Sequence, residues 1–382
     1  MNDLPATWPL TVAIAPDSFK GSLSAAEAAA AMAEGVRASL GPEAVISVCP
    51  MADGGEGTLD AILAVWGVAA RVLSTVDALG RPRSARVGVS LDGRTAVIEA
   101  AEANGLPAVM DRALEPLRAD SFGVGILARQ LLDDGVHEIL LCVGGSASTD
   151  GGTGMLRALG ARFLGRDGEN VAPGGAGLFD IVTVDTSGLH ERAGDVLWRV
   201  AVDVTNPLCG DDGAASVFGP QKGATVSDIH TLDAGLARLC AVVTLTTGVD
   251  MLGRPGAGAA GGMPATLVPL LGAEMIPGSI MVADAVGLVD RLAAADVVLT
   301  GEGRFDSQSL AGKVVAAVAR LSPATAKVIV IAGSVDLSAA DTRAAGITAA
   351  FSIADGPTDL AELQADAFER VRDTTAQVCA IL

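Results

Sequence analysis

The fold is decided by the stretch LTVAIAPDSFKGSLSAAEAAA, residues 10–30. Its apolar run Leu10–Ala15 predicts a buried strand, and an alanine-rich helix is expected from about Ser24. The same order returns with a strand at Val45–Val48, the loop PMADGGEGT and a helix from about Thr58. Repeated strand, loop and helix units of this kind predict an α/β protein.

The last hundred residues repeat this order three times. Strands are predicted at 296–299, 327–331 and 347–353, followed by the loops TGEGRFD, AGSVD and ADGPTD. Two parallel strands do not make a stable sheet alone, so we expect both chain ends to share one sheet. Residues 1–76 and 284–382 are therefore predicted to form a parallel Rossmann-like or flavodoxin-like sheet domain.

The middle of the chain, residues 77–283, has a different pattern. Val87, Val89 and Leu91 alternate before the Asp92-Gly93 turn, and a returning strand through Val97 and Ile98 follows it, which together predict a hairpin. A buried strand at 139–143 leads into GGSASTDGGTG (144–154) and the helical pattern MLRALGARFL. We expect an inserted mixed α/β domain, and a substrate cleft between the two domains.

Composition excludes several classes of protein. The chain has 26 basic and 45 acidic residues, a net charge of −19, which argues against binding nucleic acid or an anionic membrane through a broad basic surface. Five scattered cysteines without a CxxC pair predict reduced thiols rather than disulfides or a zinc site. An acid stands where a signal peptide would be basic, and no run of eighteen uncharged apolar residues occurs. We expect a cytoplasmic protein, whose oligomeric state stays open, homo-oligomers included.

The loops after the predicted strands combine glycine, hydroxyl or lysine, and acid. Ligands of open α/β sheets bind at these strand ends, where glycine admits phosphate oxygens, lysine neutralises them and acids hold Mg²⁺. Three of only four lysines, Lys20, Lys222 and Lys313, lie in such loops. The pattern favours phosphoryl transfer. The candidates for substrate or phosphate binding are Asp17, Ser18, Gly54, Gly55, Ser146, Ser148, Lys222, Gly301 and Lys313.

Acidic residues stand at the same strand ends. Asp53, Glu302 and Asp306 are candidates for holding Mg²⁺. Asp203 ends the apolar stretch VLWRVAVDVTNP, where we expect a buried carboxylate, which is costly without a partner. The three histidines lie away from the glycine loops and give little support to histidine-based catalysis.

One glycine motif suggests another class of enzyme. GAGAAG, residues 256–261, matches the dinucleotide pattern GxGxxG but follows Arg254-Pro255 instead of a strand. A dinucleotide-dependent oxidoreductase would need this loop to bind a pyrophosphate. A non-catalytic binding protein for a sugar acid is the other alternative.

Six motifs taken in order resemble the bacterial glycerate kinases. They are IAPDSFKGSLSA (14–25), PMADGGEGT (50–58), GGSASTDGGTG (144–154), DVTNPLCG (203–210), FGPQKGA (218–224) and TGEGRFDSQSLAGK (300–313). The resemblance implies a two-domain α/β kinase that transfers the γ-phosphoryl group of ATP to D-glycerate with Mg²⁺, in glyoxylate or glucarate-type metabolism. It implies 2-phosphoglycerate as the usual product, with 3-phosphoglycerate as the older assignment. After GAGAAGG the chain departs from the family pattern with Met-Pro-Ala-Thr (263–266).

Together the residues and the resemblance define a hypothesis for the mechanism. Asp203 is expected to accept the proton of the substrate hydroxyl, with Asp150 as the second choice. Lys20 and Ser18 would hold anionic oxygens from the terminal domain, and Ser146, Ser148 and Lys222 would do so from the insert. Asp53, Glu302 and Asp306 would bind Mg²⁺ or fix the lysines.

Overall fold

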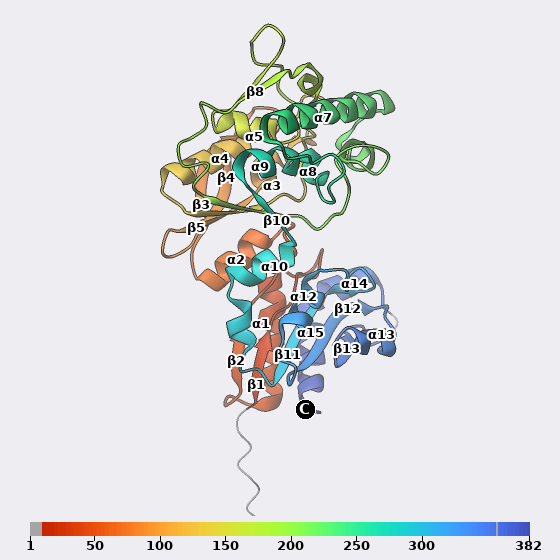
Figure 1. Cartoon of the computed structure of the whole chain (residues 1–382). Coiled ribbons are helices and arrows are strands. Elements are labelled where there is room, and N and C mark those ends of the chain that lie inside the picture. The colour runs from red at the N-terminus through yellow and green to blue at the C-terminus, as the bar shows by residue number, and fades with distance from the viewer. Residues whose placement is uncertain (1–9, 357) are drawn as a thin grey trace, which may run out of the picture. The chain divides into compact units, whose positions relative to one another are not determined.

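The computed structural model describes residues 10–356 and 358–382 (Figure 1). Residues 1–9, on which the signal-peptide expectation partly depends, lie outside the described residues. The chain divides into two compact units. The first contains the residues up to Asp53, Asp60–Gly67 and the chain from Pro277 onward, and the second contains Gly54–Leu59 and Val68–Ile276.

The first unit contains the predicted parallel sheet, built from both ends of the chain. Its strands are β1 (Thr11–Ile14), β2 (Val45–Val48), β11 (Val297–Phe305), β12 (Lys327–Val335) and β13 (Ala349–Ser352). Every neighbouring pair is parallel, in the order β13-β12-β11-β1-β2, which is the flavodoxin-like order. Figure 1 shows the red N-terminal strands in the same sheet as the blue C-terminal ones. The predicted fold class is confirmed.

Helices of this unit begin and end at residues that the sequence marks. Ser24 and Glu27 form a reciprocal capping box at the start of α1, and the Gly41 N–H caps its end. Gly35 lets α1 pack on α15, since a Cβ there would lie 2.3 Å from the Arg372 carbonyl. The helices are α1 (Ala25–Leu40), α2 (Thr58–Trp66), α10 (Gly278–Ala285), α11 (Leu288–Leu292), α12 (Val314–Leu321), α13 (Ala339–Ala344), α14 (Leu360–Ala365) and α15 (Ala367–Cys379).

Two segments expected to be loops are strands. β11 continues through most of TGEGRFD to Phe305, and β12 continues through AGSV to Val335, with Glu302 paired to Ala332. Glycine is the physical reason: a Cβ on Gly301 would lie 2.0 Å from the Ile331 carbonyl oxygen. The glycines that suggested a loop instead allow two central strands to approach closely.

The second unit is the mixed α/β insert. Its six-stranded sheet has the order β10-β9-β6-β5-β4-β3, parallel from β10 to β5 and antiparallel from β5 to β3. The strands are β3 (Arg71–Val76), β4 (Pro82–Val89), β5 (Thr95–Glu99), β6 (Glu138–Cys142), β9 (Leu197–Ala201) and β10 (Glu274–Ile276), with a separate pair β7 (Arg162–Leu164) and β8 (Thr183–Asp185). The predicted hairpin is β4–β5, with Gly93 at φ +71°.

One predicted helix is shorter than expected. MLRALGARFL begins in α5 (Thr153–Ala158), but its last residues form β7. Gly160 at φ +107° ends the helical region, and Phe163 then turns a buried side chain into the core. The remaining helices are α3 (Ala101–Asn104), α4 (Phe122–Asp133), α6 (Ala214–Phe218), α7 (Val226–Thr247), α8 (Ala259–Gly262) and α9 (Pro264–Leu271), with 3₁₀ turns at Leu106–Val109, Gly175–Asp180 and Pro220–Lys222.

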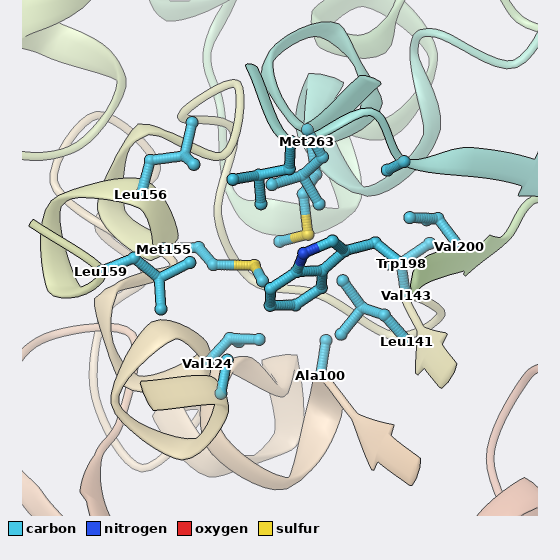
Figure 2. Packing of buried hydrophobic residues seen from close by; sticks show 14 of the residues in the cluster. Ala100, Val124, Leu141, Val143, Met155, Leu156, Leu159, Trp198, Val200 and Met263 are labelled. Carbon is cyan, nitrogen blue, oxygen red and sulfur yellow. The ribbon is translucent and has the colours of Figure 1, made fainter. Parts of the chain in front are cut away.

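The core of this unit is aliphatic and sulfur-rich around one indole. Trp198 is 1% exposed and donates its Nε1–H to the Ala193 carbonyl at 2.8 Å. Figure 2 shows its ring beside Met155, Met263 and Leu141. Among the described residues, only α7 is long and apolar enough to cross a membrane by composition, but Leu232, Leu236, Leu239 and Val243 are buried within the unit. We therefore interpret α7 as a helix that packs on this unit through one buried face.

Candidate active site

The first candidate centre lies at the carboxyl edge of the parallel sheet, where β1 meets β11. This pair is the point at which the strand order reverses, and open α/β sheets bind ligands there. The Asp17 N–H donates to the Gly301 carbonyl at 2.8 Å, and the Met51 N–H donates to the Pro16 carbonyl at 2.8 Å. These bonds extend β1 and β2 and bring Asp17, Asp53 and Glu302 to the same edge.

The three carboxyl groups at this edge repel one another. Burial, followed by the charges of Asp53 and then Glu302, raises the pKa of Asp17 to about 7, against the lowering effects of the Ser18 N–H and Lys20. Burial also raises the pKa of Glu302; Asp306 and Asp53 add to the rise, while Ser309 and Lys313 lower it. The edge therefore concentrates negative charge that a cation would stabilise.

The lysines and remaining candidates of this unit surround the acids. Lys20 is exposed in a tight turn closed by Phe19 and Leu23, whose backbones exchange hydrogen bonds of 2.9 and 3.0 Å. Lys313 stands at the N-cap of α12. Asp306 accepts the Gln308 N–H at 2.8 Å and lies 3.4 Å from Arg304 Nε.

The positions of Ser18 and Gly301 are set by backbone contacts at the same edge of the sheet. The Ser18 N–H donates to Asp17 Oδ1 at 2.6 Å. The strand contact described above accounts for glycine at 301. In residues 10–356 and 358–382, no three His, Cys, Asp or Glu side chains form a group that could hold a metal ion by themselves.

The second centre is the GGSAST loop after β6, and it is organised by Asp150. This carboxylate is fully buried and accepts five hydrogen bonds. Ser121 donates its N–H and hydroxyl to Oδ2 at 2.9 and 2.7 Å, and Gly154 donates its N–H there at 3.0 Å. Ser148 and Gly152 donate to Oδ1, both at 3.2 Å. The Gly152 and Gly154 N–H groups are therefore used to bind this side chain.

Lys222 reaches the same loop from a 3₁₀ turn. It is 3% exposed, and its ammonium donates to the Ser146 hydroxyl at 3.2 Å and to the Ser148 carbonyl oxygen. Burial lowers the pKa of Lys222 to about 8, and the charge of Asp150 opposes that shift. The structure thus brings together the predicted residues Ser146, Ser148, Asp150 and Lys222.

The loop before α2 leads into a helix turn that binds a buried acid, Glu99, much as the GGSAST loop binds Asp150. Gly54 adopts φ +86°, and the Thr58 hydroxyl donates to the Gly55 carbonyl at 2.7 Å. The Leu59 N–H in the first turn of the helix donates to Glu99 Oε1 at 2.7 Å. Sequence reasoning missed Glu99, although an acid that ends the apolar strand TAVIE is the signal that singled out Asp203.

Asp203 differs from expectation. It lies two residues beyond β9, at the carboxyl edge that also carries the GGSAST loop, but it is exposed, not buried. The apolar stretch that suggested burial ends at Ala201, and Val202 and Val204 are only partly buried. The argument from a costly buried carboxylate is therefore wrong for Asp203, although an exposed acid remains accessible to a ligand.

Each of the two units carries its own centre of acids and lysine at the ends of parallel strands, the pattern that the sequence analysis associated with phosphoryl transfer. The sequence profile of the glycerate kinase family matches residues 12–382. The chain is 42% identical to glycerate 2-kinase of Escherichia coli (strain K12) over 98% of both chains, and 40% identical to glycerate kinase of Bacillus subtilis (strain 168) over 97% of both. A crystal structure of a "putative glycerate kinase 2" from Salmonella typhimurium LT2 superposes with a TM-score of 0.88 at 43% identity, covering 98% of each chain. The chain belongs to the glycerate kinase family, and it is a phosphotransferase.

Proposed function

We propose that this enzyme transfers the γ-phosphoryl group of ATP to D-glycerate, giving 2-phosphoglycerate and ADP. The observation that carries the proposal is the 42% identity, over 98% of both chains, to a protein named glycerate 2-kinase. The small-molecule substrates and the net charge of −19 are consistent with the cytoplasmic enzyme of glyoxylate-type metabolism that we propose. Binding of both substrates between the two units stays a prediction.

The acids of the first unit fit a role in binding Mg²⁺. Glu302 Oε1 is buried without a hydrogen-bond donor, and the charge of Asp53 raises the pKa of both Asp17 and Glu302, so a bound cation would relieve both costs. One or two of Asp53, Glu302 and Asp306 would hold the ion, and nucleotide phosphates would supply further ligands, because Mg²⁺ usually takes only one or two protein carboxylates. When bound, it neutralises charge on the phosphates. Lys20, Ser18 and Lys313 would contact anionic oxygens nearby.

We assign the general base to Asp203 and a positioning role to Asp150. The oxygens of Asp150 are occupied by five internal donors, whereas Asp203 is exposed at a strand end. A loose phosphoryl-transfer transition state asks little of its base, so an exposed carboxylate suffices. Asp203→Asn should lower kcat far more than it raises KM for glycerate. The exposed Asp211, changed to Asn, is the matched control, and a near-normal kcat in Asp203→Asn would remove the assignment.

Phosphorus NMR of the reaction mixture tests the activity and its regiochemistry together. The 2-phosphoglycerate resonance with stoichiometric ADP is expected; the resonance of 3-phosphoglycerate would instead support the alternative product. Tight binding of NAD(P)H without binding of ATP would favour an oxidoreductase. Glycerate binding without release of ADP would favour a non-catalytic binding protein. Lys20→Ala should weaken binding of nucleotide or glycerate.

A further inference from the structure

Lys222 carries a buried positive charge with no carboxylate among the described residues in ion-pair contact; the charge of Asp150 acts on it from farther away and offsets burial only in part, since the pKa of Lys222 still falls. Its side chain is 3% exposed, and its two hydrogen-bond acceptors, the Ser146 hydroxyl and the Ser148 carbonyl, are neutral. Within the described part of the chain, no carboxylate lies within ion-pair distance of its ammonium. Burying an ammonium costs several kcal/mol unless an anion compensates it. An ammonium has three N–H donors, so one donor remains for a ligand.

The acceptors of Lys222 are held in place by a buried network. Asn104 Nδ2 donates to the Ser148 hydroxyl at 2.8 Å, and that hydroxyl donates to Asp150 Oδ1 at 3.2 Å. The Ala147 N–H donates to the Asn104 carbonyl at 2.7 Å. Since Asn104, Ser148 and Asp150 are each at most 1% exposed, the Ser148 carbonyl has little freedom to move. The ammonium is therefore fixed before any ligand arrives, which lowers the entropic cost of binding.

The surroundings fit a carboxylate better than a polyphosphate. The Gly152 and Gly154 N–H groups, which could have bound phosphate oxygens, are used by Asp150. Lys222 and the Ser146 hydroxyl offer a small donor set, which matches the two oxygens of a carboxylate better than the many oxygens of a polyphosphate. The acids that fit a metal-bound nucleotide, Asp53 and Glu302, belong to the first unit.

We propose that Lys222, together with Ser146, recognises the carboxylate of the acceptor substrate and determines specificity for hydroxy acids over uncharged polyols. This inference rests on the proposed function and deepens it. Burial lowers the pKa of Lys222 only to about 8, so the side chain is mainly protonated at neutral pH. A bound carboxylate would stabilise that form.

Lys222→Met tests the proposal, because methionine has a similar shape and removes the buried charge. Steady-state kinetics would use D-glycerate, glyceramide and glycerol as acceptors. We expect KM for D-glycerate to rise about 10- to 100-fold, as for loss of a charge-assisted hydrogen bond. The kcat/KM values for glyceramide and glycerol, and KM for ATP, should stay within about threefold. Lys327→Met, at the exposed start of β12, is the matched control.

The opposite pattern would overturn the proposal. A raised KM for ATP with unchanged KM for D-glycerate would show that Lys222 binds the nucleotide, and no change in either would show that it binds neither. If the wild-type enzyme does not phosphorylate D-glycerate, the proposed function fails. Calorimetric titration with D-glycerate and glycerol then still tests the subsite. The carboxylate subsite requires that D-glycerate binds to the wild type but not to Lys222→Met. Equal binding to both proteins, or binding to neither, would refute the subsite.

Discussion

Replacing Asp150 by asparagine should destabilise the second unit even though the side chain keeps its size. The amide has one oxygen, which can serve either the three donors at the Oδ2 position or the two at Oδ1. If the amide oxygen of the new asparagine takes the Oδ2 position, its NH₂ group takes the Oδ1 position and faces the Ser148 hydroxyl and the Gly152 N–H. The hydroxyl can rotate to accept a hydrogen bond, but the backbone N–H cannot.

The size of the loss in the free energy of unfolding can be worked out from these hydrogen bonds. One buried N–H without an acceptor costs about 1–3 kcal/mol. The three bonds that remain lose the strengthening that a charged acceptor gives, about 1 kcal/mol each. Removing a buried charge returns part of this cost. We expect a net loss of about 2–4 kcal/mol in the free energy of unfolding.

Urea unfolding followed by tryptophan fluorescence measures this loss, since Trp198 is buried in the core of the same unit. The matched control is Asp180→Asn, an exposed acid of the same unit, which should change the free energy by less than about 0.5 kcal/mol. A loss equally small in Asp150→Asn would refute the view that its charge holds the GGSAST loop together. Equal destabilisation of both variants would show that the effect is not local.

Three further predictions concern pH and backbone strain. Because the pKa of Asp17 is raised to about 7, the free energy of unfolding should fall as pH rises from about 4 through 7 in metal-free buffer. After allowance for partial exposure, the loss should reach roughly 2–4 kcal/mol at pH 8. Urea titrations between about pH 4 and pH 8 measure this loss, which Asp17→Asn should remove. Because the pKa of Lys222 is lowered to about 8, stability should rise by about 3 kcal/mol between pH 8 and 10.5, and a Lys222→Met protein that keeps the rise would contradict the assignment. Ala260 is a non-glycine residue at φ +49°, so Ala260→Gly should stabilise the protein by about 0.5–1 kcal/mol and raise its Tm. A lower Tm would show that the left-handed backbone at Ala260 is not strained.

The sequence alone was sufficient to predict the order of strands and helices in the parallel-sheet unit because its signals are local. The Leu10–Ala15 run and the capping residue Ser24 mark the start of the first strand and helix, and the resemblance identified the family. The shared sheet followed from the need to pair and cover parallel strands.

What the sequence could not predict depends on contacts between distant segments. Glycines next to acids suggest phosphate loops, but Gly301 is needed for strand packing and Gly152 for binding Asp150. The burial of Lys222, 74 residues away from Ser148 along the chain, has no local signal. Asp203 was misjudged because an apolar run does not show where a strand leaves the core.

The origin of the first sheet from both chain ends has a consequence for biosynthesis. The Thr11 N–H donates to Asp296, 285 residues away, and β1 pairs with β11 over residues 12–14 and 297–299. At about 5–20 residues per second, the ribosome needs roughly 15–60 s to supply that partner. During this interval one edge of β1 lacks its native neighbour, while most of the second unit, a continuous segment from Val68 to Ile276, is complete and can fold. Protecting the newly made N-terminal segment from aggregation is therefore a task that this chain order gives to the cell's chaperones.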